Sequence, residues 1–179
     1  MNDVDKLQKL YIFKAVPRLS LEELVALAPP VQFAKDVIVF HQGAPTDVAL
    51  LLIEGRLVAT VEAGGEHQQV GDIRAGEIVG EQGLFLPGGR RSATVTTAEA
   101  CTALLLSPKV MDHAASNPAI ITLEQQLLGT MARRIRKTNQ AIQQVWKSDT
   151  SGATTSATAN RSAEPTTLRQ RLANLFGGR

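Results

Sequence analysis

The chain has 179 residues, of which 44% are hydrophobic, 20% charged and 4% aromatic, with a formal net charge of +2. This length suits one globular domain with appendages, and the charge is too small to indicate nucleic acid or an acidic membrane as a partner. The single cysteine, Cys101, excludes an internal disulfide, and no cysteine or histidine pair has zinc-ligand spacing. Because the start lacks a signal pattern and no apolar run could span a bilayer, we expect a soluble, cytoplasmic protein without a transmembrane segment.

The first segment, residues 5–28, is predicted to be helical. Leu7, Leu10 and Tyr11 recur at helical spacing. The sequence Ser20-Leu-Glu-Glu23 has the pattern of a capping box that opens a helix over residues 21–28, and Pro29-Pro30 ends the segment.

Residues 31–107 consist of short β-prone runs. These runs are VIVF, ALLLIEG, LVATVEA, QQVGDI, ATVTT and CTALLL, with breaks at Gly43, Gly55, Gly64-Gly65, Gly71 and Gly76. Many short strands at even spacing predict an antiparallel β jelly-roll barrel, so the expected fold class is mainly β with flanking helices. Cys101 lies in an alternating apolar run and is predicted to be a core residue.

After Pro108 the pattern becomes helical, and we expect a long dimerisation helix over about residues 116–146. Six residues follow one another at steps of 3, 4, 3, 4 and 3, which forms a heptad seam: Leu128, Met131, Ile135, Thr138, Ile142 and Val145. Such a seam on one helix predicts a parallel homodimer through residues 121–146.

The last part of the chain differs in composition. Residues 147–166 are rich in serine, threonine and alanine and are predicted to be a flexible linker. Residues 167–177 are predicted to form a short amphipathic tail helix, in which residues 167–176 offer a leucine-bearing face and arginines to a protein partner.

Residues 80–95, GEQGLFLPGGRRSATV, interrupt the strand pattern with a single expected helical turn and a glycine-rich bend. The segment contains the groups that a buried phosphate and a sugar hydroxyl require. Arg91 and the Ser92 hydroxyl can hold phosphate oxygens, the amides around Gly83 and Leu84 add positive potential, and the Glu81 carboxylate can accept from a sugar hydroxyl.

This string resembles the phosphate-binding cassette of the cyclic nucleotide-binding domain family, in the form found in catabolite-activator-type regulators. In that form a Gly-Glu pair is followed, ten residues after the glutamate, by Arg-Ser-Ala. The resemblance implies a cyclic nucleotide-binding domain over residues 1–146, with Glu81 on the ribose and Arg91 on the phosphate. The other ligand-contacting residues that it implies are Gly80, Gln82, Gly83, Leu84, Arg90, Ser92, Ala93 and, on the dimer helix against the base, Thr138 and Asn139. Gln82 and Asn139 depart from the apolar residue and the serine usual at these positions.

The function implied by the resemblance is a regulatory, signal-transducing sensor of cyclic AMP, or of cyclic GMP, which signals through the dimer helix and the tail. One alternative is a ligand-independent dimeric adaptor in which Glu81 and Arg91 pair with each other. The other is a transcription regulator that relies on another DNA-binding subunit, because only about 30 residues follow the dimer helix and direct DNA binding is not expected. No catalytic residue, metal site or further cofactor is predicted, since the chain shows no nucleophile with a base and no Walker-type loop.

Overall fold

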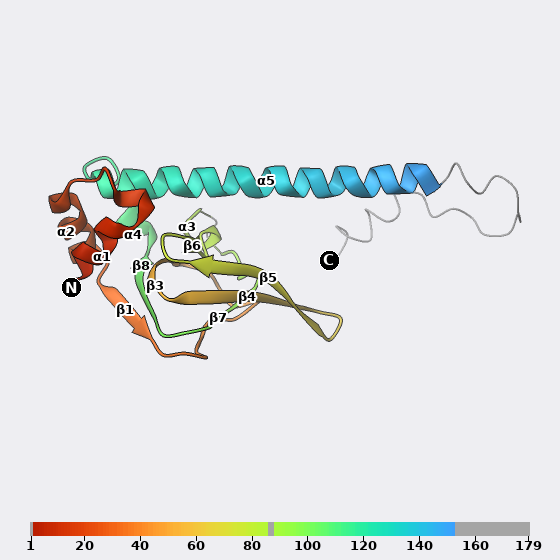
Figure 1. Ribbon diagram of the computed structural model, residues 1–179, viewed down its shortest axis with the longest axis horizontal. Helices are drawn as coiled ribbons and strands as arrows, with labels where there is room; N and C mark the ends of the chain where they lie inside the picture. The colour runs from red at the N-terminus through yellow and green to blue at the C-terminus, as the bar shows by residue number, and fades with distance from the viewer. Residues whose placement is uncertain (1, 86–87, 153–179) are drawn as a thin grey trace, which may run out of the picture. The chain divides into compact units, whose positions relative to one another are not determined.

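The computed structural model describes residues 2–85 and 88–152. Short helices flank eight strands, and a long helix follows them (Figure 1). The helices are α1 (Asp3–Lys9), the 3-10 helix η1 (Tyr11–Phe13), α2 (Arg18–Leu27), α3 (Gln82–Phe85), α4 (Pro108–Met111) and α5 (Pro118–Gly152). The strands are β1 (Pro30–Phe33), β2 (Ile38–Phe40), β3 (Ala49–Glu54), β4 (Arg56–Ala63), β5 (Glu66–Arg74), β6 (Ile78–Val79), β7 (Thr94–Thr97) and β8 (Cys101–Leu106).

The strands form two four-stranded sheets, in the orders β1-β8-β3-β6 and β2-β7-β4-β5. Every strand pair in both sheets is antiparallel. Two stacked antiparallel sheets of four strands each, with sequence neighbours divided between them, make a jelly roll. The predicted fold class, mainly β with flanking helices, is therefore confirmed.

Two apolar cores hold this arrangement together, and β3 contributes to both. Leu50 and Leu52 point between the two sheets, where they join Phe40, Leu57 and Val95. The alternate residues of the same strand, Ala49, Leu51 and Ile53, pack with the buried faces of α1, α2, α4 and the start of α5. Because both faces of β3 are covered, its sequence is a continuous apolar run.

The N-terminal helices begin at different residues from those predicted. A capping box is present, but at Asn2, whose side chain accepts from the Asp5 amide while the Asp5 carboxylate accepts from the Asn2 amide. The predicted box at Ser20 is wrong, because α2 starts at Arg18 and the Ser20 amide already donates to the Pro17 carbonyl at 3.1 Å. Proline is favoured where a helix begins, since it has no N–H to leave unpaired.

Two strands and one glycine also differ from the sequence expectation. The short strands β1 and β6 were not predicted; β1 starts at Pro30, which an edge strand tolerates. Gly71 was expected to break a strand but lies within β5, next to a register shift in which Ala59 faces Gly71 and Thr60 faces Gln69. This leaves one extra residue, a β-bulge, and a Cβ on Gly71 would lie 3.3 Å from the Ala59 Cβ.

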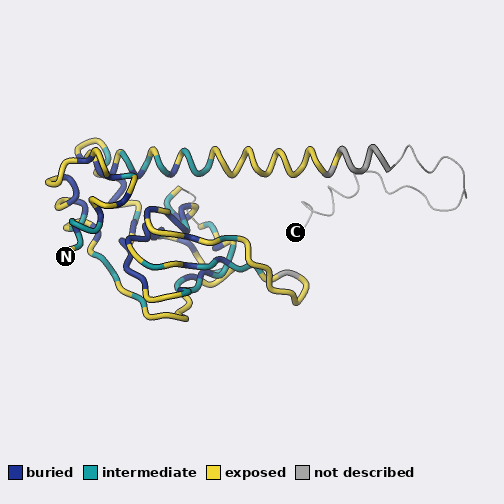
Figure 2. Tube along the Cα trace, viewed as in Figure 1, coloured by how far each residue is buried: buried dark blue, intermediate teal, exposed yellow. Residues whose placement is uncertain are grey.

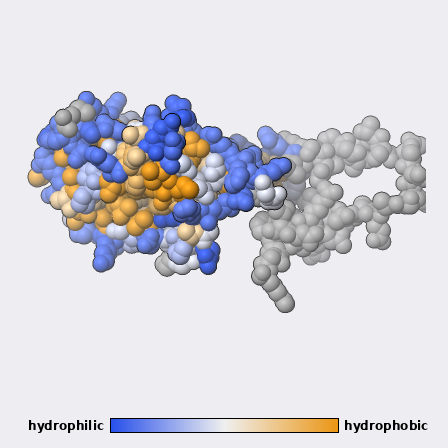
Figure 3. Space-filling view, turned by 90° about the horizontal axis from the view of Figure 1, so that it is seen from below, coloured by the Kyte–Doolittle hydropathy of each residue, from blue (hydrophilic) through white to orange (hydrophobic). Residues whose placement is uncertain are grey.

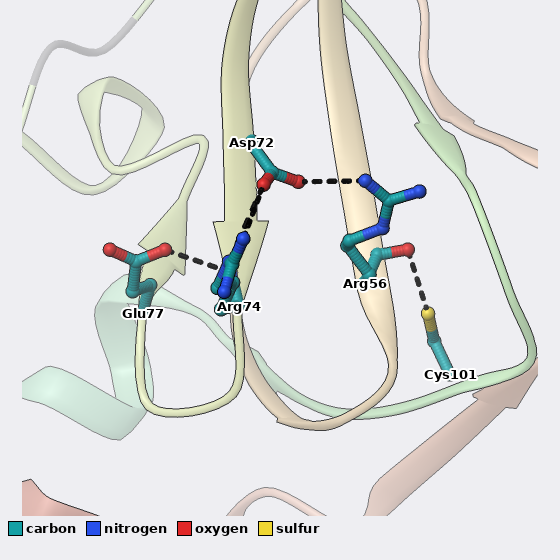
Figure 4. Close-up of polar contacts among 5 residues, drawn as sticks. All are labelled: Arg56, Asp72, Arg74, Glu77 and Cys101. Atoms are coloured by element: carbon teal, nitrogen blue, oxygen red, sulfur yellow. Dashed lines mark hydrogen bonds and ion pairs between the residues drawn. The ribbon is translucent and has the colours of Figure 1, made fainter.

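The base of the β4–β5 hairpin carries a charged cluster over a buried thiol (Figure 4). Asp72 pairs with Arg56 at 3.5 Å and with Arg74 at 3.2 Å, and the Glu77 carboxylate accepts from the Arg74 amide at 2.8 Å. The Cys101 thiol is buried, as predicted, and its sulfur lies 3.1 Å from the Glu99 carbonyl oxygen and 3.4 Å from the Arg56 carbonyl oxygen, either of which can accept its proton. Burial raises the pKa of this thiol, so it stays protonated at neutral pH.

Helix α5 is fixed at its start by Asn117, which is buried. Its side-chain oxygen accepts from the Ala119 amide at 2.8 Å, and its side-chain nitrogen donates to the Ser20 carbonyl at 3.1 Å and to the Glu23 carboxylate at 2.8 Å. This one side chain therefore caps α5 and ties it to α2. Residues 119, 120, 123 and 127 of α5 are buried in the helix-facing core.

Beyond Leu127 the burial of α5 ends (Figure 2). None of residues 128–144, nor Trp146, is buried, and the seam residues Leu128, Ile135 and Ile142 are 66%, 61% and 48% exposed. The chain divides near this point into a compact unit that ends at Arg133 and a second that starts at Arg134.

The helix continues past its predicted end at residue 146 to Gly152, into the first part of the expected linker. Extending a helix that already exists adds a hydrogen bond for each residue fixed, and the sequence has no proline or glycine between residue 146 and Gly152 to stop it. The rest of the predicted linker and the predicted tail helix, residues 167–177, lie outside the described residues.

The surface mixes charged and apolar groups, and Figure 3 shows apolar side chains gathered on one face. The large hydrophobic side chains exposed in the first unit are Tyr11, Leu19, Leu27, Val37, Ile38, Val70, Phe85, Leu105, Ile121 and Leu128. Such exposure is common on folded domains and by itself names no partner. Within residues 2–85 and 88–152, none of the helices has the length and apolar character to cross a membrane.

Candidate functional site

The segment singled out in the sequence forms a tight structure after β6. Gly80 follows the strand, α3 is the expected single helical turn, and the chain re-enters the sheet at β7. Gly80 has a φ of +77°, and a Cβ there would lie 2.5 Å from Nη1 of Arg91 and 2.8 Å from a ring carbon of Phe40. Only glycine fits this conformation and this approach without strain.

The Arg91 guanidinium lies inside the protein, with 8% of the residue exposed. Its Nη1 donates to the Val48 carbonyl at 2.7 Å and to the Gly80 carbonyl at 3.2 Å. The Cζ atom lies 3.6 Å from the centroid of the Phe40 ring, and Nη2 lies 4.0 Å from the Asp47 carboxylate. Two carbonyls on one edge and an aromatic ring on one face therefore fix the orientation of this cation.

The electrostatics at Arg91 result from two opposing effects. Loss of hydration lowers the pKa of Arg91, while the negative charges of Asp47 and then Glu81 raise it. An arginine keeps its proton in such surroundings, so the site holds a buried positive charge. Glu81 is itself only 3% exposed, so a carboxylate and a guanidinium are enclosed in the same segment.

The loop between β2 and β3 lies directly against the second half of this segment. The hydrogen bonds that join them are Gly43 N to Arg91 O at 2.8 Å, Arg91 N to Ala44 O at 2.9 Å, Thr46 N to Gly89 O at 3.1 Å and Arg90 Nη1 to Gly43 O at 2.7 Å. Pro45 and Arg90 also form an isolated β-bridge. The β2–β3 loop and the segment around Arg91 thus behave as one structural unit.

Sequence reasoning missed the residues that surround Arg91. Phe40, Asp47 and Val48 all contact its guanidinium, yet each lies more than 40 residues away in the chain. The only sequence signal nearby is the polar run HQGAPTD, in which Gly43 predicts a turn. Nothing in the spacing of that run indicates that it would fold onto residues 88–91.

Two amides have a different role from the one expected. The N–H groups of Gly83 and Leu84, predicted to face a phosphate, donate to the carbonyls of Gly80 at 3.1 Å and Glu81 at 3.0 Å. A single helical turn is closed by such local hydrogen bonds, which occupy the N–H groups that complete it. An anion at this site would therefore rely on Arg91 rather than on these two amides.

The remaining predicted site residues are divided between three environments. The side chains of Gln82, Arg90 and Ser92 are exposed, and Ala93 packs against the core between the sheets. Thr138 and Asn139 are exposed on α5 in the second unit, which begins at Arg134.

A family model described as the cyclic nucleotide-binding domain matches residues 30–117. A solved structure, the N-terminal domain of a transcriptional regulator from Streptomyces coelicolor A3(2), is 30% identical to this chain, with a TM-score of 0.57 over 77% of this chain and 95% of that one. The chain belongs to the cyclic nucleotide-binding domain family. The resemblance found in the sequence is therefore confirmed.

Further relatives of this cyclic nucleotide-binding domain protein are consistent with the family assignment. It is 27% identical over 142 residues to the CRP-like cAMP-activated global transcriptional regulator of Mycobacterium tuberculosis strain H37Rv, covering 79% of this chain and 62% of that protein. The catabolite activator protein of Thermus thermophilus shares the fold, with a TM-score of 0.64 and 20% identity over 75% of this chain and 62% of that one. The chain thus spans about three fifths of the length of the curated relatives it matches.

The family match begins at the first residue of β1 and ends at Asn117, directly before α5. It therefore covers both sheets, the β2–β3 loop and the segment around Arg91. The N-terminal helices and α5 lie outside it. Among the residues that the structure describes, no group of three or more histidine, cysteine, aspartate or glutamate side chains is arranged to hold a metal ion.

Proposed function

We propose that this domain binds a cyclic nucleotide, with cyclic AMP as the first candidate, and that it acts by binding rather than by catalysis. The observation that carries the proposal is the buried, oriented Arg91 guanidinium. Its hydrogen bonds to described residues all come from Nη1. This leaves Nε for an anion, together with Nη2, whose ion pair with the exposed Asp47 carboxylate is long at 4.0 Å. A guanidinium with two adjacent donors suits two oxygens of one phosphate.

The other groups of the cassette complete the recognition of a nucleotide. The buried Glu81 carboxylate can accept a hydrogen bond from a ribose hydroxyl, and the exposed Ser92 hydroxyl follows Arg91 directly in the chain. Cyclic AMP is preferred over cyclic GMP because curated relatives are named as cAMP-activated regulators. Thr138 and Asn139 are the proposed base contacts, supplied by α5.

We infer that the signal leaves the domain through α5. Leu128, Ile135 and Ile142 form an exposed seam at heptad spacing, which a second copy of the helix would cover. Residues 121–146 are accordingly the proposed homodimer contact. Residues 167–176 are the proposed contact for a protein partner.

The proposal is tested by replacing Arg91 and its neighbour separately. Arg91→Ala should weaken cyclic AMP binding by ~2 to 5 kcal/mol, roughly 30-fold to several thousand-fold, because a desolvated phosphate loses its counter-charge. Arg91→Lys keeps the charge but loses the two-pronged geometry, so its affinity should be intermediate. Arg90→Ala is the matched control: this arginine is exposed and donates to Gly43, so its loss should change affinity by less than about threefold.

Calorimetry with cyclic AMP and cyclic GMP measures these affinities on the full chain, and circular dichroism verifies that each variant is folded. Equal affinity of Arg91→Ala and the parent would show that the phosphate does not bind at Arg91. If the folded parent binds neither nucleotide, the proposed function is wrong and the ligand-independent adaptor becomes the leading alternative. Tighter binding of cyclic GMP would reverse the proposed preference for adenine.

A further inference from the structure

One buried hydroxyl beside the cassette has no hydrogen-bond partner. Thr46 is 6% exposed, and its Oγ1 is the single buried side-chain nitrogen or oxygen atom without a partner within residues 2–85 and 88–152. The backbone of the same residue is well anchored, since its amide donates to the Gly89 carbonyl at 3.1 Å. The hydroxyl is therefore held at a fixed place with its own bonding capacity unused.

The unpartnered hydroxyl lies against the turn that precedes Arg91. A Cβ on Gly83 would come within 2.2 Å of Thr46 Oγ1, so the hydroxyl contacts the cassette where a side chain of residue 83 would otherwise be. The next residue, Asp47, places its carboxylate 4.0 Å from Nη2 of Arg91, and Val48 accepts from Nη1. Thr46 thus belongs to the strand entry that holds the guanidinium, and it faces the turn that begins with Glu81.

Leaving a hydroxyl buried without a partner costs free energy, and folded proteins seldom do so. This free-energy cost is offset if a bound ligand supplies the missing hydrogen-bond partner. An anionic oxygen is the strongest acceptor for a hydroxyl. The neighbouring buried guanidinium of Arg91 is the proposed binding group for such an anion. The position, burial and unused donor of Thr46 therefore fit a site that a ligand fills.

We propose that Thr46 is a further ligand-binding residue of this domain, whose hydroxyl donates a hydrogen bond to an oxygen of the bound cyclic phosphate. This inference rests on the proposed function, because it requires a phosphate at Arg91. It adds a contact from the β2–β3 loop to a proposed phosphate site whose other residues lie within 80–93. The loop then both orients the arginine, through Val48, and contacts the ligand.

The rival explanation is purely steric: Thr46 fills the space that Gly83 leaves empty. Two substitutions separate these roles. Thr46→Val keeps the shape of the side chain and removes the hydroxyl, whereas Thr46→Ser keeps the hydroxyl and removes the methyl group. The full chain of each variant is titrated with cyclic AMP by calorimetry, and the thermal midpoint of the ligand-free protein is measured alongside.

Thr46→Val should weaken cyclic AMP binding roughly tenfold or more, the range of a hydrogen bond to a charged group, and Thr46→Ser should stay within about threefold of the parent. The ligand-free midpoint of Thr46→Val should be equal to or above that of the parent, because the variant no longer buries an unpartnered hydroxyl. Sulfur accepts hydrogen bonds poorly, so the effect of Thr46→Val should shrink with one of the two phosphorothioate forms of cyclic AMP. A steric role would not produce this last difference.

Two results would overturn the inference and leave the proposed function intact. One is a Thr46→Val variant that binds within twofold of the parent while Arg91→Ala does not bind. The other is a loss of affinity and of thermal midpoint that is equal in Thr46→Val and Thr46→Ser, which would show a packing role. If the parent itself binds no cyclic nucleotide, the proposed function and this inference both fail.

Discussion

Replacing Gly83 by alanine should destabilise the domain by about 1–2 kcal/mol, and most of this cost should come from Thr46. The new Cβ would lie 2.2 Å from Thr46 Oγ1 and 3.0 Å from the Asp47 amide nitrogen. Overpacking of this kind costs ~1–3 kcal/mol, because neighbours must leave their preferred rotamers. Alanine is favoured over glycine inside a helix by up to ~1 kcal/mol, which offsets part of the cost, since Gly83 lies within α3.

A double-mutant cycle measures the contribution of Thr46 directly. The parent, Gly83→Ala, Thr46→Ala and the double variant are unfolded in urea, and their unfolding free energies are compared. Thr46→Ala removes the atom at 2.2 Å and leaves the backbone contacts at 3.0 and 3.2 Å, so the cost of Gly83→Ala should fall by about 1 kcal/mol in that background. The same cost in both backgrounds would refute the contact between Thr46 and the cassette turn.

Two further predictions concern α5. Asn117→Ala should lower the unfolding free energy by about 2–3 kcal/mol, because it removes the cap on Ala119 and the buried hydrogen bond to the Ser20 carbonyl. Urea unfolding checks this, and a change under ~0.5 kcal/mol would contradict it. Ile135→Asp should convert a dimer to monomers in sedimentation velocity by burying a charge in the seam, whereas Gln140→Asp, on the opposite side of the helix, should not; a monomeric parent would rule out the proposed dimer.

Most strands of the barrel could be predicted from residues whose burial is decided locally. The runs that became β3 and β8 are apolar enough to be recognised without knowing their partners, because both cover two cores. The cassette turn was equally visible, since Gly80 and Glu81 precede a short helical segment and a glycine-rich bend in one continuous stretch. Features of this kind depend on near neighbours in the chain.

The features that sequence could not give depend on contacts between distant segments. The ring of Phe40 and the carbonyl of Val48 meet Arg91 only because β2, β3 and the cassette are brought together by the two sheets. The unpartnered state of the Thr46 hydroxyl is likewise a property of the folded surroundings. The capping-box pattern at Ser20 was misleading, because helix α2 begins two residues earlier, at Arg18, with Pro17 as its N-cap.

The surroundings of Arg91 bear on how tightly a nucleotide can bind. A guanidinium already oriented by two carbonyls and a ring loses little further freedom when an anion arrives, so little of the interaction energy is spent on ordering it. Burial lowers the pKa of Arg91 because it disfavours the charged form, and a phosphate would offset that cost more fully than the Asp47 carboxylate at 4.0 Å does. The ligand should therefore raise the unfolding free energy of the domain with the logarithm of its concentration once that concentration exceeds the dissociation constant, and a Thr46 hydroxyl that gains a partner would lower the dissociation constant and add to that rise.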